Sequence, residues 1–327
     1  MKFHGEIPGG KQELKPLLYP FNDSYPKKLW SKYRWWKNSN LKKLLPNLNK
    51  NAEWLTVIDR LGAPGDALIS SNVIRGIKQK FPKLQVNFIT PHPKLVELDP
   101  SIDSINGKET FYTFDSSYWE LIVRKETKEN IVSHNLKKLG IVDCDYKAKF
   151  YLSDREKIWA EDILKNYKKP LVSICTQSKE VVKNWPLENW IILAQKLASK
   201  FTLIQVGDEK EPIIQGLTRF AGKYSMRESA ALMSKMNLFI GPDSLLMHIA
   251  NGLNIPSIII FGGSRPIDCF GYNENVNMGF KADCGPCWIH SGYESCEHKV
   301  ECIKRIKVHD VLGRFHEIDF NIKNEKQ

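Results

Sequence analysis

Short apolar runs alternate with amphipathic stretches from about Glu53 onward, and this alternation constrains the fold more than any other feature of the chain. The apolar runs have the length and composition of buried strands, and the stretches between them have helical periodicity. This order predicts an α/β fold, a parallel sheet covered by helices. In the first part of the chain the pattern predicts strands at 54–61, 85–90 and 119–124, and helices at 66–80 and 131–139.

The alternation starts again after a polar helical stretch at 154–167 and the break Lys168-Lys169-Pro170. We therefore expect two doubly wound domains, 51–167 and 168–327, that face each other across a cleft. Ligands of such sheets bind at the carboxyl ends of the strands. The second series of elements is predicted to contain strands at 171–175, 201–206, 238–240 and 257–261, and helices at 187–200, 226–235 and 244–251.

The positive charge of the chain is concentrated at its N-terminus. The chain has 48 Lys and Arg against 37 Asp and Glu, a net charge of +11. Residues 1–50 carry +8 of this charge, and the other 277 residues carry +3. The pattern predicts a nearly neutral body with a basic N-terminal extension, residues 1–50. No stretch approaches 18 uninterrupted apolar residues, and the first ten residues lack the apolar core of a secretory signal, so we expect a cytoplasmic protein.

Three polar segments follow predicted strands, where a ligand is expected. In the first, Gly62 and Gly65 flank two residues between a strand and a helix. Glycines let the backbone approach a ligand closely, and a helix N-terminus favours an anion. Asp66 at the start of this helix has two interpretations, a general base or the N-cap. Taken alone it favours the N-cap, because Asp is among the best capping residues.

The second segment, residues 176–185 (TQSKEVVKNW), lies between a strand and a helix. Its two lysines, Lys179 and Lys183, have the charge needed to bind a phosphate. For Lys179 we favour the simpler interpretation of a solvated loop lysine.

The third segment, residues 241–248 (GPDSLLMH), also joins a strand to a helix. Asp243 and Ser244 are both competent caps, and the free amides of the helix could bind a diphosphate. His248 lies one turn into the helix, where a structural histidine fits the pattern as well as a ligand contact does.

The order and spacing of these segments resemble glycosyltransferase family 9, the heptosyltransferases of lipopolysaccharide assembly. The resemblance covers roughly residues 54–311 and implies the GT-B architecture of two Rossmann-like domains. It also implies an inverting transfer of a sugar, typically heptose from ADP-heptose, onto a hydroxyl of a lipopolysaccharide-type or other glycan. It rests on Gly65-Asp66 before a helix that ends in Lys80-Phe81-Pro82, on Lys183-Asn184-Trp185-Pro186, and on Gly241-Pro242-Asp243-Ser244 with Met247-His248.

The resemblance also implies residue roles. Asp66 matches the family's proposed catalytic base, which raises this interpretation above the N-cap, and Lys183 matches its phosphate-binding lysine. A carboxylate would take the proton of the attacking hydroxyl, and positive charge would stabilise the departing diphosphate, so no catalytic metal is implied. The expected donor-binding residues are Thr176, Gln177, Lys183, Asp243, Ser244 and His248, with Gly62 and Gly65 in the glycine loop.

The chain departs from the family pattern in two places. Leu245-Leu246 follows Asp243-Ser244 where the family usually has glycine, often followed by proline. A bulky residue there would narrow the donor pocket, which bears on the identity of the sugar or nucleotide. The basic extension is the second departure, since family members usually begin close to the first strand.

Four cysteines fall in the segment 284–302, in the pattern C-x2-C-x8-C-x5-C. Four thiolates at such spacing could hold a structural zinc or iron ion. A similar segment occurs in some members of the family, including an iron-bearing subgroup that glycosylates autotransporter proteins. A Cys-rich loop packed without metal fits the pattern equally well. The four candidate ligands are Cys284, Cys287, Cys296 and Cys302.

Residues 27–50 of the extension contain eight bases and no acid, interleaved with Trp30, Tyr33, Trp35 and Trp36. This composition is typical of an anchor to an anionic membrane surface, which predicts a peripheral position on the inner membrane. Packing of the aromatic side chains on the body is the alternative.

Three other functions stay open at this point. They are a protein heptosyltransferase of the autotransporter type, a nucleotide-sugar epimerase, and a nucleic-acid-binding protein on a GT-B-like scaffold. The nearly neutral body and the lack of a recognised nucleic-acid motif argue against the last. An epimerase would need an additional base in the cleft and no acceptor.

Overall fold

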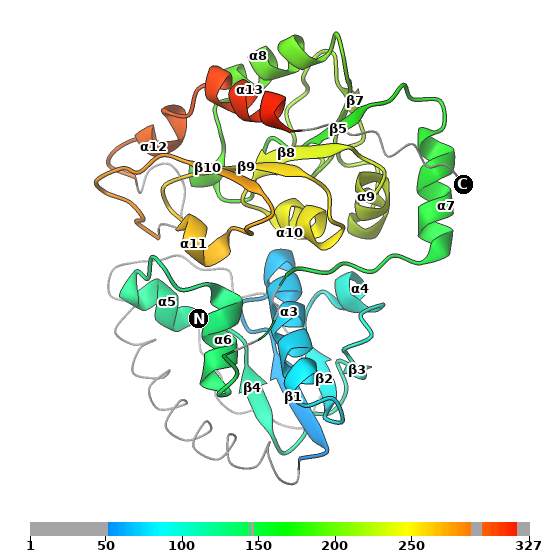
Figure 1. Ribbon diagram of the computed structural model, residues 1–327, viewed down its shortest axis with the longest axis vertical. Coiled ribbons are helices and arrows are strands. Elements are labelled where there is room, and N and C mark those ends of the chain that lie inside the picture. The colour runs from blue at the N-terminus through cyan, green and yellow to red at the C-terminus, as the bar shows by residue number, and fades with distance from the viewer. Residues whose placement is uncertain (1–51, 143, 145–146, 289–295, 319–327) are drawn as a thin grey trace.

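The computed structural model describes residues 52–142, 144, 147–288 and 296–318, so the basic extension lies outside the described residues. Two parallel sheets form two halves, one above the other in Figure 1, and each sheet is flanked by helices. This arrangement confirms the predicted α/β class and its two doubly wound units.

The first sheet has four strands in the order β3-β2-β1-β4, all parallel. Its central strands are buried apolar runs, as is typical of parallel sheets; Leu55 and Val57, for example, have no exposed surface. The elements of this half are β1 (Trp54–Ile58), α3 (Pro64–Lys80), β2 (Gln85–Ile89), α4 (Pro93–Val96), β3 (Ser104–Ile105), β4 (Thr113–Asp115), α5 (Trp119–Arg124) and α6 (Ile131–Lys138).

The prediction of a strand at 119–124 is wrong, because these residues form helix α5. The fourth strand is β4, which ends four residues earlier. Tyr118, Leu121 and Ile122 are buried, a spacing of three and four residues that belongs to one face of a helix. A short apolar run fits a strand or a helix equally well by composition, and here the helical face is the one that packs on the core.

The second sheet has six parallel strands in the order β10-β9-β8-β5-β6-β7. The strands and helices predicted for this half are confirmed, with ends that differ by a few residues. Its elements are β5 (Leu171–Ile174), the 3-10 helix η2 (Val181–Lys183), α8 (Leu187–Leu197), β6 (Thr202–Gln205), β7 (Thr218–Arg219), α9 (Met226–Met233), β8 (Leu238–Pro242), α10 (Leu245–Gly252), β9 (Ser257–Phe261), α11 (Ile267–Phe270), β10 (Val276–Gly279), α12 (Glu301–Lys304) and α13 (Val308–Glu317).

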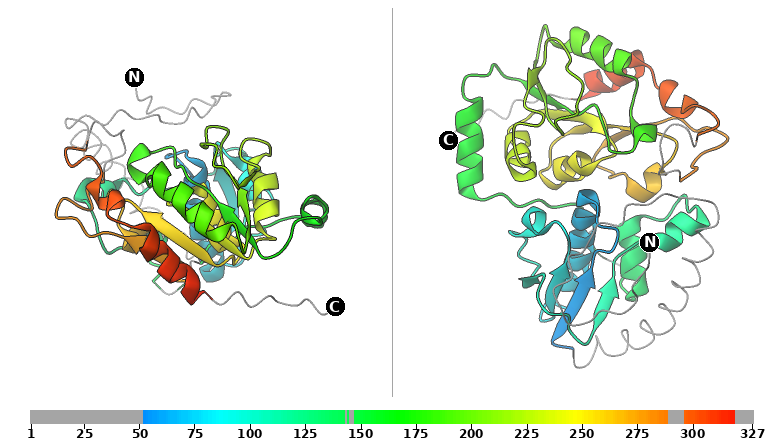
Figure 2. Two further views of the ribbon diagram at one scale, coloured as in Figure 1. Left: turned by 90° about the horizontal axis from the view of Figure 1, so that it is seen from above. Right: turned by 180° about the vertical axis from the view of Figure 1, so that it is seen from behind.

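Helix α7 (Asp154–Leu164) precedes the second sheet in the chain and packs against α9 (Figures 1 and 2). Arg227 of α9 donates from Nε and Nη2 to the two carboxylate oxygens of Glu156, at 2.7 and 2.8 Å. These charge-assisted bonds hold the pKa of Glu156 at about 2. By its contacts α7 lies with the second half, and the domain limits 51–167 and 168–327 stay a prediction.

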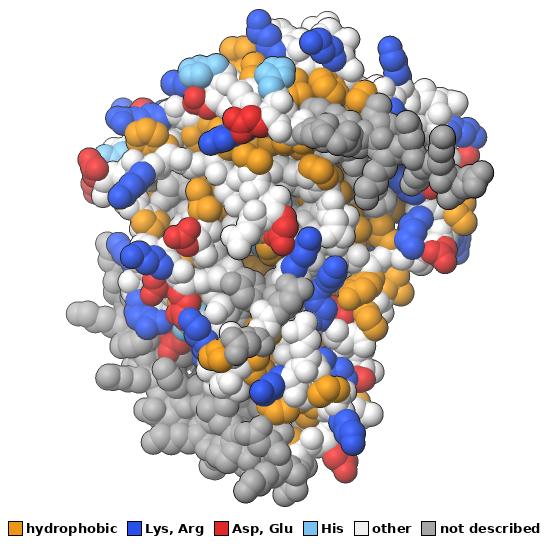
Figure 3. Space-filling model, viewed as in Figure 1, with side chains coloured by type: hydrophobic (Ala, Val, Ile, Leu, Met, Phe, Trp, Pro, Cys, Tyr) orange, Lys and Arg blue, Asp and Glu red, His pale blue; other side chains and the backbone are white. Residues whose placement is uncertain are grey.

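The two halves contact each other directly through α3 and α10. One apolar core includes Ile69 of α3 and Met247 of α10. Among the described residues, no helix has the length and apolar character needed to cross a membrane. On the face shown in Figure 3, basic and acidic side chains are interspersed over both halves, as expected for a body of nearly balanced charge.

The strand order reverses between β1 and β4 in the first sheet and between β5 and β8 in the second. Open parallel sheets bind ligands outside the carboxyl ends of the strands at such reversals. The loops after these four strands therefore define where the site should lie.

Candidate functional site

The predicted base, Asp66, lies at the third position of α3 and is not its N-cap. Ala63 is the N-cap, and its amide donates to Asp66 Oδ2 at 3.3 Å. The hydroxyl of Tyr118 donates to Asp66 Oδ1 at 2.8 Å. Burial raises the pKa of Asp66, and the Tyr118 hydrogen bond together with the charges of Arg265 and Lys183 opposes that rise. Each carboxylate oxygen keeps a lone pair for a further donor, such as an attacking hydroxyl.

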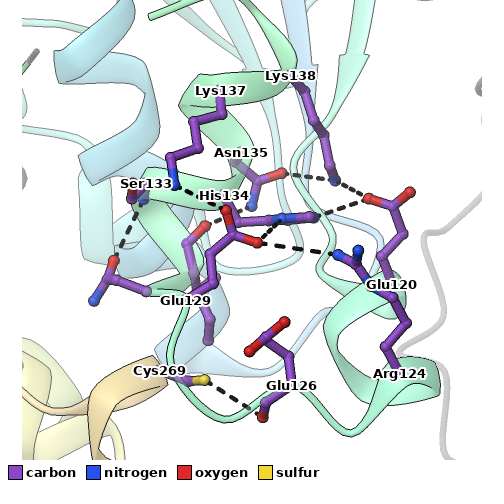
Figure 4. Close-up of polar contacts among 12 residues, drawn as sticks. Glu120, Arg124, Glu126, Glu129, Ser133, His134, Asn135, Lys137, Lys138 and Cys269 are labelled. Carbon is purple, nitrogen blue, oxygen red and sulfur yellow. Dashed lines mark hydrogen bonds and ion pairs between the residues drawn. The ribbon is translucent and has the colours of Figure 1, made fainter. Parts of the chain in front are cut away.

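Tyr118 occupies the N-cap position of α5, and a buried polar network fixes that helix. His134 of α6 lies between two carboxylates (Figure 4). Its Nε2 is 2.9 Å from Glu120 Oε2, and its Nδ1 is 3.0 Å from Glu129 Oε2. Glu120 lies in the first turn of α5, so this network fixes the start of the helix at which Tyr118 is the N-cap.

The loop between α5 and α6 is attached to the second half of the molecule. The carbonyl oxygen of Glu126 accepts from Trp288 Nε1 at 3.0 Å and from Cys269 Sγ at 3.7 Å, the latter bond being drawn in Figure 4. Tyr118 also packs edge to face on Phe270 of α11, with ring centroids 5.7 Å apart. The segment that carries Tyr118, the hydrogen-bond partner of Asp66, is therefore anchored to the second half of the molecule.

Glycine is needed at the two positions of the first segment for different structural reasons. Gly62 has a φ of 73°, in the left-handed region that favours glycine. A side chain at Gly65 would place its Cβ 3.2 Å from the His248 ring, so glycine there permits the close approach of α3 to α10.

A further carboxylate, the buried Asp59, lies after β1 in the same connection and was missed by the sequence analysis. It accepts from the Gly62 amide at 3.0 Å and from the Thr90 hydroxyl at 3.3 Å. Burial, together with the nearby charge of Asp66, raises its pKa to about 7. The carboxylate ends a buried strand, and that position after β1 is the signal by which the sequence could have revealed it.

The raised pKa of Asp59 predicts a pH-dependent effect of Asp59→Asn. Between about pH 4 and 7 the folded protein holds a proton that the unfolded chain has released, so the Asp59 contribution to the free energy of unfolding falls as pH rises. The variant is therefore expected to match the wild type below pH 4. At pH 8 it should be more stable by on the order of 2–4 kcal/mol, at about 1.4 kcal/mol per pKa unit. Thermal or urea unfolding at both pH values measures this; an equal difference at both would contradict the assignment.

Lys183 and Asp243, two predicted donor-site residues, meet at the strand-order reversal of the second sheet. Lys183 Nζ lies 2.9 Å from Asp243 Oδ2 and 3.4 Å from Glu180 Oε2. Both partners of the Lys183–Asp243 pair are buried. Lys183 comes from η2 after β5, and Asp243 directly follows β8. The structure thus brings together two residues that are 60 positions apart in the chain.

Arg265 follows β9 and was also missed by the sequence analysis. Its Nη2 donates to both oxygens of Glu180, at 2.9 and 3.2 Å. The guanidinium lies over the rings of Phe270 and Trp288, 4.9 and 5.7 Å from their centroids. Its sequence signal, a basic residue in a glycine-containing loop after a strand, is weak by itself.

Thr176 and Gln177 are organised by Glu211, a buried carboxylate after β6 that the sequence analysis did not select. Glu211 accepts from the amides of Thr176 and Gln177, at 2.9 and 3.1 Å, and from the Thr176 hydroxyl. Burial raises the pKa of Glu211, and these donors oppose the rise. Thr176 is buried and Gln177 is exposed, so only the second presents its side chain to solvent.

Ser244 is the N-cap of α10, and its side chain makes no capping hydrogen bond. His248 is buried one turn later, and its Nδ1 lies 2.7 Å from the hydroxyl of Tyr272. Burial lowers the pKa of His248 to about 4, so the imidazole is neutral at pH 7. A neutral, partnered imidazole supports packing between the halves, and it supplies no positive charge to a phosphate.

Three of the four cysteines lie between β10 and α12, and the fourth, Cys302, lies in α12. Cys302 Sγ accepts from the Gly263 amide at 3.1 Å, and Cys296 Sγ accepts from the Val300 amide at 3.3 Å. Within the part of the chain that the structure describes, no three or more His, Cys, Asp and Glu side chains are grouped so that they could hold a metal ion. Residues 289–295, between the second and third cysteines, are outside that part, and the metal site stays a prediction.

Comparison with known families decides the classification. The model of glycosyltransferase family 9 (heptosyltransferase) matches residues 118–292, more than half of the chain. The chain belongs to glycosyltransferase family 9. The matched region contains Tyr118, Lys183, Asp243 and Arg265, whereas Asp66 precedes it. No curated protein sequence matches the chain significantly.

Solved structures of this family share the GT-B fold of the chain. The glycosyltransferase family 9 protein of Veillonella parvula superimposes with a TM-score of 0.66 at 13% identity, covering 82% of this chain and 98% of that one. ADP-heptose LPS heptosyltransferase II of E. coli gives 0.61 at 13% identity, covering 80% and 97%. The iron-containing glycosyltransferase TibC of enterotoxigenic E. coli gives 0.64 at 18% identity, covering 81% and 76%. At these identities the similarity establishes the fold alone.

Proposed function

We propose that this family 9 glycosyltransferase transfers a sugar, heptose from ADP-heptose, onto an acceptor hydroxyl with inversion at the anomeric carbon. The observation that carries the proposal is the meeting of Asp66, from the first half, with Lys183 and Arg265, from the second. Both cations lie close enough to Asp66 for their charges to oppose the rise of its pKa. A carboxylate that faces cations across the junction of two doubly wound units fits a base on one substrate and a phosphate site for the other.

In the proposed reaction, Asp66 accepts the proton of the acceptor hydroxyl as the hydroxyl oxygen attacks the anomeric carbon. The bond from that carbon to the diphosphate breaks, and the nucleoside diphosphate leaves with the bonding electrons. Lys183 stabilises the negative charge that develops on the leaving oxygen. Because the attack comes from the side opposite the diphosphate, the configuration inverts.

The experiment that tests the proposal is a titration of the full chain with ADP-, GDP- and UDP-sugars, followed by transfer assays. ADP-heptose is expected to bind most tightly and to be consumed only when an acceptor is added. The same assay in excess EDTA tests the proposed metal-independent catalysis, and undiminished turnover is the expected result. Acceptor-free formation of a free, epimerised sugar would favour the epimerase instead. Failure of every nucleotide sugar to bind would reject the proposal.

Two kinds of acceptor are to be compared in that assay, a lipopolysaccharide-type glycan and a serine- or threonine-rich autotransporter passenger segment. We propose the glycan, since the residue pattern resembles the lipopolysaccharide enzymes. Transfer to the autotransporter segment alone would contradict the glycan acceptor and indicate protein glycosylation.

Tyr118 is proposed to orient Asp66 and to keep it ionised. Loss of its hydrogen bond in Tyr118→Phe removes an interaction that lowers the pKa of the carboxyl. The acidic limb of the kcat–pH profile should therefore move to higher pH, and kcat at neutral pH should fall about 10-fold. Phe270→Leu removes the ring that Tyr118 contacts and keeps the Tyr118 hydroxyl. Because Phe270 also contacts the Arg265 guanidinium, this control is read from the pH profile alone, which should not shift. An unshifted pH profile in Tyr118→Phe would contradict the role.

A structural zinc or iron ion bound by Cys284, Cys287, Cys296 and Cys302 is proposed as a separate feature. Such an ion would hold the segment after β10 and take no part in the reaction. Elemental analysis of purified protein should give about one metal ion per chain, and a serine variant of Cys287 should lose it. A substoichiometric content of both metals would reject the site.

Membrane attachment through residues 27–50 is proposed from their basic and aromatic composition. Co-sedimentation with anionic vesicles measures this attachment. Binding to oligonucleotides is tested at the same salt concentration. Binding to oligonucleotides alone would favour a nucleic-acid partner.

A further inference from the structure

Glu180 lies between two cations in the second half of the site. Its Oε2 is 3.2 Å from Arg265 Nη2 and 3.4 Å from Lys183 Nζ, and its Oε1 is 2.9 Å from the same arginine nitrogen. One carboxylate oxygen is therefore within ion-pair distance of a guanidinium and an ammonium at once. The two cations frame a position that an oxyanion fills.

The two cations are more deeply buried than the carboxylate between them. The side chains of Arg265 and Lys183 are 5% and 10% exposed, whereas that of Glu180 is 23% exposed. Stacking on Phe270 and Trp288 also fixes the plane of the guanidinium. The carboxylate thus lies on the solvent side of the two cations.

The balance of charge disfavours a diphosphate in this cluster while the Glu180 carboxylate stays in place. Asp66, Glu180 and Asp243 place three carboxylates beside the two cations Lys183 and Arg265. A dianionic group that entered this cluster unchanged would meet an excess of negative charge, which costs free energy in a buried site. Removal of Glu180 from the cation pair releases two ion-pair positions, one for each phosphate group of a diphosphate.

We propose that Arg265 is a second cation for the donor's diphosphate, and that Glu180 occupies the place of that diphosphate until the donor binds. The inference rests on the proposed function and names a binding residue beyond Lys183. A planar guanidinium binds a phosphate through two parallel hydrogen bonds, so Arg265 adds orientation to the point charge of Lys183. Glu180 and the donor compete for the same two cations, which makes the carboxylate an internal competitor of the substrate.

The test compares the binding of ADP, inorganic pyrophosphate and adenosine to the full chain by calorimetry. Glu180→Gln keeps the size of the side chain but removes its charge, and it should bind ADP and pyrophosphate about 3- to 10-fold more tightly than the wild type. Arg265→Gln should bind both at least ~10-fold more weakly, and Arg265→Lys should lie between it and the wild type. In the double variant Glu180→Gln/Arg265→Gln, the gain from Glu180→Gln should shrink, because one of the two competed cations is gone. Adenosine, which has no phosphate, should bind equally to all of them.

Several results would overturn the inference. Unchanged binding of pyrophosphate and ADP by Arg265→Gln would show that Arg265 does not bind the diphosphate. If the same variant also raised the KM of an acidic acceptor, the anionic group that Arg265 binds would belong to the acceptor. A loss of affinity in Glu180→Gln as large as that in Arg265→Gln would mean that Glu180 only holds the arginine in place. A parallel loss of adenosine binding in Arg265→Gln would indicate a general disturbance of the fold and would contradict a phosphate-specific role. Failure of the wild type to bind any nucleoside diphosphate would instead reject the proposed function itself.

Discussion

Replacement of Asp66 by asparagine is expected to lower kcat for sugar transfer at least ~10²-fold while the donor still binds. The amide cannot accept the proton of the attacking hydroxyl at neutral pH. Its oxygen can still accept the Ala63 amide or the Tyr118 hydroxyl, so the start of α3 should keep its structure. Single-turnover kinetics with saturating ADP-sugar, together with a calorimetric Kd for ADP, measures the two effects separately.

Asp268→Asn is the matched control for this variant. Asp268 is an exposed aspartate of α11 in the second half, and its replacement removes the same charge without touching Asp66. The control should turn over within about 2-fold of the wild type, as expected for a surface substitution. Near-normal turnover of Asp66→Asn would exclude Asp66 as the base, and another carboxylate, with Asp59 the first candidate, would have to be tested.

Replacement of Lys183 by glutamine is expected to lower kcat/KM about 10²–10³-fold, the scale observed when one stabilising donor is removed from a developing anion. The loss should appear in both ADP affinity and kcat, because the proposed role of the ammonium is to contact the diphosphate of the bound donor, and more strongly as the leaving group departs. The variant also leaves Asp243 without its ion-pair partner at 2.9 Å, so thermal unfolding has to be measured beside activity.

Lys179→Gln is the control that separates a specific role of Lys183 from an effect of the loop's overall positive charge. Lys179 lies four residues earlier in the same loop and is exposed. Its replacement should leave ADP affinity within about 2-fold of the wild type, because an exposed charge is screened by water and salt. If both variants lost affinity equally, the loop would act through its overall charge and Lys183 would have no special role.

Local patterns predicted most of the elements and the order of the two halves. Strands such as Trp54–Ile58 and Ser257–Phe261 are apolar runs bounded by turns, and helix α3 ends at Lys80 before Phe81-Pro82, as expected. The failure at Trp119–Arg124 has a local cause as well. This six-residue segment has four apolar side chains, which fit both periods, and only the packing of the segment on the core decides between them.

The residues of the candidate site also fall into two groups, those that a local motif marked and those that only the tertiary structure revealed. Asp66, Lys183 and Asp243 follow strands within short motifs, so the sequence marked them before their contacts were known. Tyr118 gave no such signal, because its significance lies in a hydrogen bond to a residue 52 positions away. Taken alone, Asp66 favoured the N-cap, and the structure places it at the third position of α3, because one residue type serves at both positions of a helix.

By itself the sequence determined the α/β class, the two doubly wound units, the segments at their strand ends and the resemblance to a family, because periodicity, turn residues and motif spacing are local properties of the chain. Only the tertiary structure decided which side chains share the site. Asp66, Tyr118, Glu180 and Arg265 come from separate segments of the chain, and their charges and hydrogen bonds act on one another only because two parallel sheets bring the carboxyl ends of their strands together.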